Sequence, residues 1–288
     1  MSTAPASPAA PLTARTAIAA GVDLPQLGLG VFQIPPDQVQ PIVEQALDVG
    51  YRHVDTAAAY NNESGVGAAL RASGLPREEV FVTSKLRNGE QGYDAALRAH
   101  AETLERLGVD HLDLFLIHWP NPGAGLWQET WRAFERLHSE GSVRAIGVSN
   151  FLPEHLRELT EVASTLPAVN QIELHPTHSQ SDLVAHHREL GITVESYSPL
   201  GQGADLDLPE ITRIAEAHCA TPAQVVLRWH IQHGFVVIPK TTSRDRLVEN
   251  LDVDGFRLSA EQMATIDALD RGHRIGNDPA TFSISQIR

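Results

Sequence analysis

Short apolar strands recur along this chain, and nearly every strand ends in a polar residue that can take part in chemistry. Helical stretches separate the strands, so the chain consists of repeated strand–helix units. In a closed barrel built from such units, all strand ends point to one face, and active sites lie on that face. The polar endings are Asp55, Lys85, His118, Ser149 with Asn150, Gln171, Tyr197 with Ser198, and Lys240. We therefore expect these side chains to converge on one mouth.

Alternation of strand and helix predicts an α/β fold, and two architectures have that order. The first is a (β/α)8 TIM barrel, and the second is an open doubly wound sheet. About eight strand–helix units favour the closed barrel. A Gly-x-Gly-x-x-Gly motif after the first strand would favour the open sheet with a Rossmann dinucleotide site. The two candidate stretches fail at the third glycine, where Gln33 and Leu206 stand.

The chain of 288 residues is long enough for one barrel domain. Residues 15–29 have the short apolar flanks and central glycine of a β-hairpin, which we expect to close the barrel floor. Residues 1–12 are rich in Ala, Pro and Ser without hydrophobic periodicity. We therefore predict a disordered tail at residues 1–14 and a single barrel domain at residues 15–288. Beyond residue 270 the pattern is irregular, which predicts a short C-terminal tail.

The charge of the chain excludes some classes of partner. With 22 Lys and Arg against 36 Asp and Glu, the formal net charge is −14, which argues against general nucleic-acid binding. Cys219 is the only cysteine, so no intramolecular disulfide can form, which fits a reducing cytosol. No signal peptide and no apolar run of about 20 residues is present, so we expect a cytoplasmic protein without a membrane partner.

Four of the residues near strand ends suit carbonyl reduction when they are considered together. A tyrosine has a pKa near ~10, and a neighbouring ammonium favours the phenolate and lowers that pKa. Asp55 can hold Lys85 against Tyr60, and His118 can donate a hydrogen bond to a carbonyl oxygen. Such a set protonates an oxygen on which negative charge grows during hydride transfer. Each residue alone also fits a structural role, as an ion-pair partner, a packed aromatic or a core histidine.

Longer motifs extend this pattern. Residues 50–63, which read GYRHVDTAAAYNNE, closely resemble the first signature of the aldo-keto reductases. The resemblance continues in order between residues 20 and 270, through residues 112–120, 147–151, 170–173, 196–201 and 238–242. That family is a (β/α)8 barrel that binds NADP(H) without a Rossmann fold, and this resemblance implies the same here.

The resemblance also implies roles for individual residues. Tyr60 is expected to be the general acid, with Asp55 and Lys85 tuning it and His118 orienting the carbonyl. Phe32 and Trp119 are expected to form an apolar wall over a small-molecule carbonyl substrate, although several animal members carry tryptophan at the position of Phe32. The expected cofactor contacts are Tyr197 under the nicotinamide; Ser149, Asn150 and Gln171 at its carboxamide; Ser198, Leu200 and Gly201 at the pyrophosphate; Lys240, Thr241 and Arg246 at the 2′-phosphate; and Glu249 and Asn250 at the adenine.

A cluster of cations supports the preference for NADPH. Lys240, Arg244 and Arg246 lie close together in an otherwise acidic chain. Hydrogen bonds to charged groups contribute about 1.5–3 kcal/mol each, which is enough to favour NADPH over NADH. The same cluster also fits a solvated helix start.

Short loops indicate a branch of the family. Only residues 119–126 separate His118 from the next predicted helix, and the tail after residue 270 is short. Both features resemble the bacterial 2,5-diketo-D-gluconate reductase branch, whose members tend to be monomers. We expect an open site that accepts dicarbonyls, sugar ketones or aromatic aldehydes.

Two other functions remain open at this stage. One is an NADP(H)-binding, redox-sensing regulatory subunit with little turnover. The other is a metal-dependent hydrolase that uses His175 and His178, although Pro176 breaks any helix that would bring those ligands together, so we expect no metal. His186 and His187 lie in a predicted helix, and we expect both to be solvated.

Overall fold

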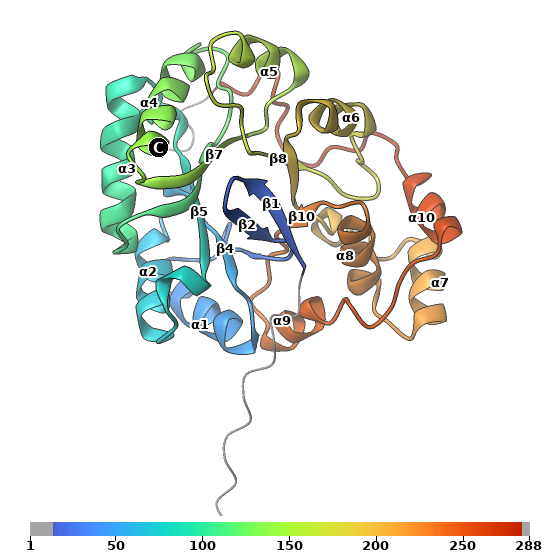
Figure 1. Cartoon of the computed structure of the whole chain (residues 1–288). Helices are drawn as coiled ribbons and strands as arrows, with labels where there is room; N and C mark the ends of the chain where they lie inside the picture. Colours follow the sequence, from blue (N-terminus) through green and yellow to red (C-terminus); the bar gives the residue numbers. More distant parts are fainter. Residues whose placement is uncertain (1–13, 284–288) are drawn as a thin grey trace, which may run out of the picture.

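The barrel predicted from the sequence is present. The computed structural model describes residues 14–283, and its main sheet has eight parallel strands in chain order (Figure 1). The backbone N–H of Val237 donates to Gln26 O (2.8 Å) and that of Gly28 donates to Val237 O (2.9 Å), and these bonds close the sheet. The strands are β3 (Leu29–Gly30), β4 (His53–Asp55), β5 (Phe81–Leu86), β6 (Leu112–Ile117), β7 (Val143–Ser149), β8 (Val169–Glu173), β9 (Thr193–Tyr197) and β10 (Val236–Val237). The prediction of a (β/α)8 barrel is confirmed.

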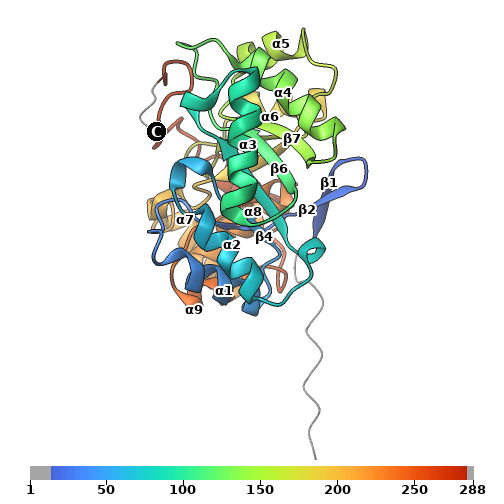
Figure 2. The same ribbon diagram turned by 90° about the vertical axis from the view of Figure 1, so that its left-hand side faces the viewer.

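Helices surround the barrel and bury apolar side chains against it or against neighbouring helices (Figures 1 and 2). They are α1 (Val39–Val49), α2 (Glu63–Ala72), α3 (Tyr93–Leu107), α4 (Trp127–Ser139), α5 (Pro153–Thr160), α6 (Ser181–Leu190), α7 (Pro209–His218), α8 (Pro222–Gln232), α9 (Arg244–Leu251) and α10 (Ala260–Asp267). Short 3-10 turns are η1 (Ala58–Tyr60), η2 (Arg77–Glu79), η3 (Asn88–Glu90) and η4 (Gly201–Gly203). Among residues 14–283, no helix has the length and apolar character of a membrane span.

An antiparallel hairpin closes one end of the barrel. It consists of β1 (Arg15–Ala19) and β2 (Val22–Pro25). The hairpin residues Val22 and Leu24 are buried and pack with apolar side chains of the barrel strands, namely Phe81, Leu114, Leu116, Ala145, Val169 and Val236. In Figure 2 the hairpin and the C-terminal segment lie at opposite ends of the molecule. The predicted hairpin floor is confirmed.

The structure describes the predicted C-terminal tail as far as residue 283, but almost none of the predicted N-terminal tail. Residues 1–13 of the predicted disordered tail lie outside the described residues. After α10, residues 268–283 contain no helix or strand, as the irregular sequence pattern predicts.

One prediction about a helix surface is wrong. His187 is fully buried, because the inner face of α6 consists of Leu183, Val184 and His187. Its Nε2 lies 2.7 Å from Asn170 Nδ2, and burial lowers the pKa of the imidazole to about 4. His187 is therefore a neutral core residue, whereas the neighbouring His186 is partly exposed and lies 3.9 Å from Glu189 Oε2.

The hairpin floor should contribute measurably to stability. Leu24→Ala removes a fully buried side chain from the floor, so we expect the free energy of unfolding to fall by about 2–5 kcal/mol. Asp23→Ala on the same strand is the matched control, because Asp23 is exposed. Urea unfolding of both variants measures the difference, and equal midpoints would contradict the packing described.

Candidate active site

The four predicted catalytic residues meet around one buried ammonium. Lys85 Nζ donates to Asp55 Oδ1 (2.6 Å), to the backbone oxygen of Thr56 (2.9 Å) and to the Tyr60 hydroxyl (3.1 Å). Lys85 is fully buried, so its three hydrogens have partners and no water is needed. The ammonium therefore fixes the position of both the carboxylate and the phenol.

Local structure explains why these residues meet. Strands β4 and β5 are neighbours, and Asp55 is paired with Thr83, so Lys85 lies two residues further along the same face. Tyr60 ends the short turn η1, which begins three residues after β4. Asn61 ends that turn in the left-handed region with a φ of 56°, and Arg87 donates to its side chain and to Ala58 O. The turn is thereby held against the end of β5.

The pKa of Tyr60 is raised, whereas the sequence predicts that a neighbouring lysine lowers it. Burial raises the pKa of the phenol above its usual value, and the lowering by Lys85 does not offset this effect. The lysine acts in the predicted direction, but desolvation of the phenolate is larger. Burial alone would lower the pKa of Lys85, but Asp55 and Tyr60 more than offset it, so the pKa of Lys85 is raised. The pair at neutral pH is therefore a phenol beside an ammonium.

His118 faces this group from the next strand. It follows β6, and its ring centroid lies 5.7 Å from that of Tyr60 in an edge-to-face arrangement. Burial and the charge of Lys85 hold the pKa of the imidazole well below its usual value. A neutral imidazole has one N–H donor, so His118 can donate a hydrogen bond without carrying charge.

The residues predicted for the nicotinamide carboxamide are linked by hydrogen bonds. Tyr197 Oη donates to Asn150 Oδ1 (2.8 Å), and Asn150 Nδ2 donates to Ser149 Oγ (3.0 Å). Ser149 Oγ donates to the backbone oxygen of Gln171 (2.9 Å). Asn150 adopts the left-handed region with a φ of 64° directly after β7, where strain is common at functional sites. The ends of β7, β8 and β9 therefore form one polar patch.

Glu195 is a site residue that the sequence analysis missed. Gln171 Nε2 donates to Asp55 Oδ2 (2.8 Å) and to Glu195 Oε2 (3.0 Å), so one amide joins two buried carboxyl groups. Burial and the charge of Asp55 raise the pKa of Glu195 to about 8. Glu195 lies two residues before Tyr197 in the same strand, and this period of two could have identified it.

Comparison with known proteins decides the family. The model of the Aldo/keto reductase family matches residues 26–271. An aldo-keto reductase of Mycobacterium sp. (strain KMS) is 52% identical over 265 residues, covering 92% of this chain and 96% of the relative. The glyoxal reductase of Bacillus subtilis (strain 168) is 48% identical over 260 residues, covering 90% and 94%. A mutant of Gox0644 crystallised with NADPH has a TM-score of 0.90 and 47% identity, covering 93% of this chain and 98% of that one.

This chain belongs to the aldo/keto reductase family. It is an NADP-dependent oxidoreductase with NADPH as its cofactor, and the prediction of the family is confirmed. The polar patch at the mouth of this aldo/keto reductase fits the cofactor, since Gln171 brings a buried side-chain amide to it. Its amide nitrogen faces the two carboxyl groups, which leaves the oxygen to accept a hydrogen bond.

The predicted phosphate and adenine contacts of the reductase are only partly available. Ser198 and Gly201 have positive φ values of 48° and 58°. Lys240 and Arg246 are exposed, but Arg244 pairs with Asp48 (2.9 Å). The remaining predicted contacts are engaged or packed: Thr241 Oγ1 accepts from Ser243 N, Glu249 Oε1 accepts from Thr221 Oγ1, Asn250 is buried beside Tyr51, and Leu200 packs against the core. The exposed cations therefore remain the best candidates for a phosphate site.

Phe32 and Trp119, the residues predicted to form a substrate wall, contact different aromatic rings. Phe32 is 51% exposed, and its ring centroid lies 5.0 Å from that of Tyr60. Trp119 is buried, and its ring centroid lies 4.4 Å from that of Phe282 in the C-terminal segment. The structure does not pair Phe32 with Trp119 in the part of the chain it describes. Phe282 was not predicted, because no local pattern indicates that the tail returns to β6.

Of the two histidines weighed as metal ligands, His175 has polar side-chain partners, whereas neither ring nitrogen of the buried His178 has a hydrogen-bond partner among residues 14–283. His175 Nδ1 lies 2.8 Å from Asp205 Oδ2, and its Nε2 lies 3.2 Å from Glu173 Oε1. Within residues 14–283, no group of three or more His, Cys, Asp or Glu side chains could hold a metal ion. The contacts of His175 therefore describe an ion-paired network, which is analysed below.

The buried carboxyl group of Glu195 should make stability depend on pH. Its pKa is raised to about 8 in the folded protein, so its stabilising contribution is present below the unfolded pKa and is lost as the pH rises toward 8. Glu195→Gln removes this loss. From pH 5 to pH 8 we expect the variant to gain on the order of 2–4 kcal/mol relative to the unchanged protein.

Urea unfolding at the two pH values measures this difference. Glu161→Gln, at an exposed glutamate after α5, is the control and should show no such gain. An equal pH dependence for the Glu195 variant and the unchanged protein would contradict the burial of an acid at this position.

Proposed function

We propose that this protein reduces aldehydes and ketones to alcohols with NADPH, and that Tyr60 is the general acid. The observation that carries the proposal is the position of the Tyr60 hydroxyl, 3.1 Å from the Lys85 ammonium and on the same side as His118. A phenol and a neutral imidazole together offer two hydrogen-bond donors to one carbonyl oxygen.

The roles of the four residues follow from their charges. The cofactor, when bound, supplies the hydride to the carbonyl carbon. Negative charge then grows on the carbonyl oxygen, and Tyr60 donates its proton to that oxygen. The Lys85 ammonium stabilises the phenolate that is left, and Asp55 keeps the ammonium in place. Burial raises the pKa of Tyr60, which keeps the proton on the phenol until a stronger base forms beside it.

The polar patch supports a single orientation of the nicotinamide. With its nitrogen engaged by Asp55 and Glu195, Gln171 can only accept a hydrogen bond from an amide of the cofactor through Oε1. Ser149, Asn150 and Tyr197 complete the patch. We assign the exposed Lys240 and Arg246 to the 2′-phosphate, where two cations distinguish NADPH from NADH.

The substrate class is proposed from the open mouth and from a relative. On the side of Trp119, the loop between β6 and α4 (118–126) lies beside the C-terminal segment and beside Gln91, which donates to Trp119 O (2.8 Å). The glyoxal reductase named above supports dicarbonyls as substrates, beside the sugar ketones and aromatic aldehydes expected for a 2,5-diketo-D-gluconate reductase-like branch. The monomeric state and the cytoplasmic location remain predictions.

Tyr60→Phe tests the proposed acid. We expect the kcat for an aromatic aldehyde to fall by about 10²–10⁴-fold, because the oxygen loses its proton donor, while NADPH still binds. Absorbance of NADPH during turnover and quenching of tryptophan fluorescence on binding measure the two effects. Tyr93→Phe, a tyrosine at the start of α3, is the control and should keep full turnover. A redox-sensing subunit would instead bind NADPH with little turnover in the unchanged protein.

The phosphate site is tested by removing one cation. We expect Lys240→Ala to raise the KM for NADPH by about tenfold or more and to leave the KM for NADH unchanged, because only NADPH carries the 2′-phosphate. Arg136→Ala on the outer surface of α4 is the control, since Arg136 pairs with Glu140 instead (2.8 Å). Parallel rises for both cofactors would remove Lys240 from the proposed site.

A further inference from the structure

The C-terminal segment, residues 270–283, is held at the mouth of the barrel through its backbone. Arg271 N and His273 N donate to the backbone oxygen of Thr177 (3.2 and 3.0 Å). Ile275 N donates to Glu173 Oε1 (2.6 Å), and Gly276 N donates to Glu173 Oε2 (2.7 Å). One buried carboxylate therefore binds two successive amides of a segment that has no regular structure of its own.

Glu173 is well placed to hold this segment. It is the last residue of β8 and is 1% exposed. It shares a strand face with Gln171, two residues earlier, so the same face carries the proposed carboxamide contact and the anchor of the segment. A Cβ on Gly276 would lie 2.6 Å from Glu173 Oε2 and 3.5 Å from the Tyr197 hydroxyl. Only glycine allows the segment to approach this closely.

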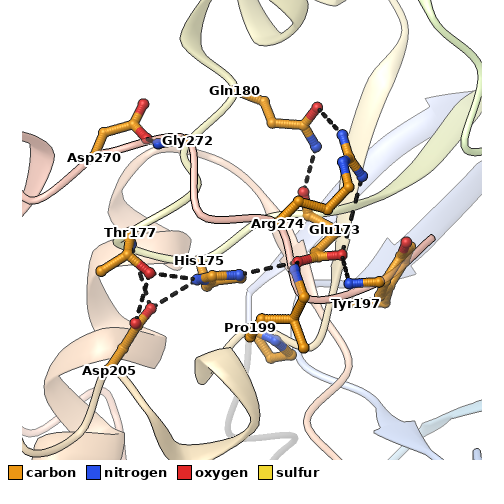
Figure 3. Close-up of polar contacts among 12 residues, drawn as sticks. Glu173, His175, Thr177, Gln180, Tyr197, Pro199, Asp205, Asp270, Gly272 and Arg274 are labelled. Carbon is orange, nitrogen blue, oxygen red and sulfur yellow. Dashed lines mark hydrogen bonds and ion pairs between the residues drawn. The ribbon is translucent and has the colours of Figure 1, made fainter. Parts of the chain in front are cut away.

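His175 connects the anchor to the loop after β9, as Figure 3 shows. Its ring lies between Glu173 Oε1 (3.2 Å) and Asp205 Oδ2 (2.8 Å). Burial would lower the pKa of His175, but the two carboxylates raise it to about 9, so the ring carries a positive charge at neutral pH. That charge, with Arg274 at 4.0 Å from Glu173, balances both carboxylates.

Asp205 lies beneath the loop predicted to receive the cofactor pyrophosphate. A Cβ on Gly201 would lie 2.7 Å from its Cγ, and Thr177 donates to Asp205 Oδ1 (2.8 Å). An unpaired carboxylate at this depth would repel a diphosphate. The pairing of Asp205 with His175 removes this repulsion and connects the loop after β9 to the end of β8.

The other end of the segment reaches the predicted substrate wall. The Phe282 ring lies 4.4 Å from Trp119, and Gly123 N donates to Ser283 Oγ (2.8 Å). The segment thus runs from the side of α10 to the loop that precedes α4 (Figures 1 and 2). The position of the C-terminal segment therefore determines where the Phe282 ring lies against Trp119.

We propose that Glu173, His175 and Asp205 form a clamp that holds the C-terminal segment on the cofactor loop, so that one buried network sets both the substrate wall and the phosphate side of the site. These are positioning residues, because they act through Phe282 and the loop after β9. This inference rests on the proposed function, in which carbonyl substrates bind beside Trp119.

Hydrogen exchange and kinetics on Glu173→Gln test the clamp directly. The glutamine keeps the volume but loses the charge and one acceptor. We expect the amides of Ile275 and Gly276 to exchange about tenfold faster or more than in the unchanged protein. We also expect the KM for an aromatic aldehyde to rise by about tenfold with little change in kcat, since binding is lost equally in the ground and transition states.

Two further variants test the substrate side and the cofactor side of the clamp independently. Phe282→Ala should reproduce the rise in KM for the aromatic aldehyde while the amides of Ile275 and Gly276 stay protected. His175→Gln should speed their exchange and also raise the Kd for NADPH, because the link to the loop is lost. His186→Gln, on the partly exposed face of α6, is the matched control and should change none of these quantities.

Several results would overturn the clamp. Unchanged amide exchange in Glu173→Gln would contradict it. So would an aldehyde KM for Glu173→Gln that is no higher than that of His186→Gln, and so would an unchanged NADPH Kd in His175→Gln. If Glu173→Gln does not fold, Gly276→Ala displaces the segment while leaving the network intact, and the same exchange and KM changes are expected. A protein that turns over no carbonyl would refute the proposed function, and the exchange and NADPH data would still decide the clamp.

Discussion

A lysine ammonium buried inside the barrel determines how the rest of the site is arranged. An unpaired charge in a protein interior costs several kcal/mol, so Lys85 must have acceptors in fixed positions. Asp55, the carbonyl of Thr56 and the Tyr60 hydroxyl provide them at 2.6–3.1 Å. The same contacts that satisfy the buried lysine also position Tyr60 for the proposed proton transfer. Rigid parallel strands on both sides keep it from relaxing.

The order of strands and helices in the sequence was sufficient to predict the barrel, its hairpin floor and the meeting of the four central residues. These residues lie at the ends of the three neighbouring strands β4, β5 and β6 or in the turn after β4, and parallel strands place their ends on one face. The same argument placed Ser149, Asn150, Gln171 and Tyr197 in one patch. These predictions needed only the direction of each strand, which the hydrophobic pattern indicates.

Contacts between distant segments could not be predicted in this way. Gln171 reaches Asp55 across 116 positions in the chain, and Glu173 reaches Gly276 across 103. Nothing local marks Phe282 as a site residue, and only the spacing of two from Tyr197 indicates Glu195. The pKa of Tyr60 also needed the structure, because the sequence indicates that a lysine is near but not how completely water is excluded. His187 was predicted to be solvated because it is polar, but it lies on the inner face of α6 with Leu183 and Val184.

The hairpin floor makes the barrel a blind-ended tube. Below Asp55 and Glu195, the interior holds apolar side chains of the strands, Val22 and Leu24 of the hairpin, and the buried polar residues His53 and Thr83. His53 Nε2 lies 3.1 Å from Thr83 Oγ1 and 3.6 Å from Glu195 Oε1, and burial lowers the pKa of this imidazole to about 3. Because the hairpin covers this neutral histidine, we expect the proton that Tyr60 gives up in the proposed mechanism to be replaced from the open end, past the exposed Phe32 and past His118. An alcohol product bound over Tyr60 would keep water from the phenolate. In the proposed mechanism, Tyr60 is therefore reprotonated only after the product has left.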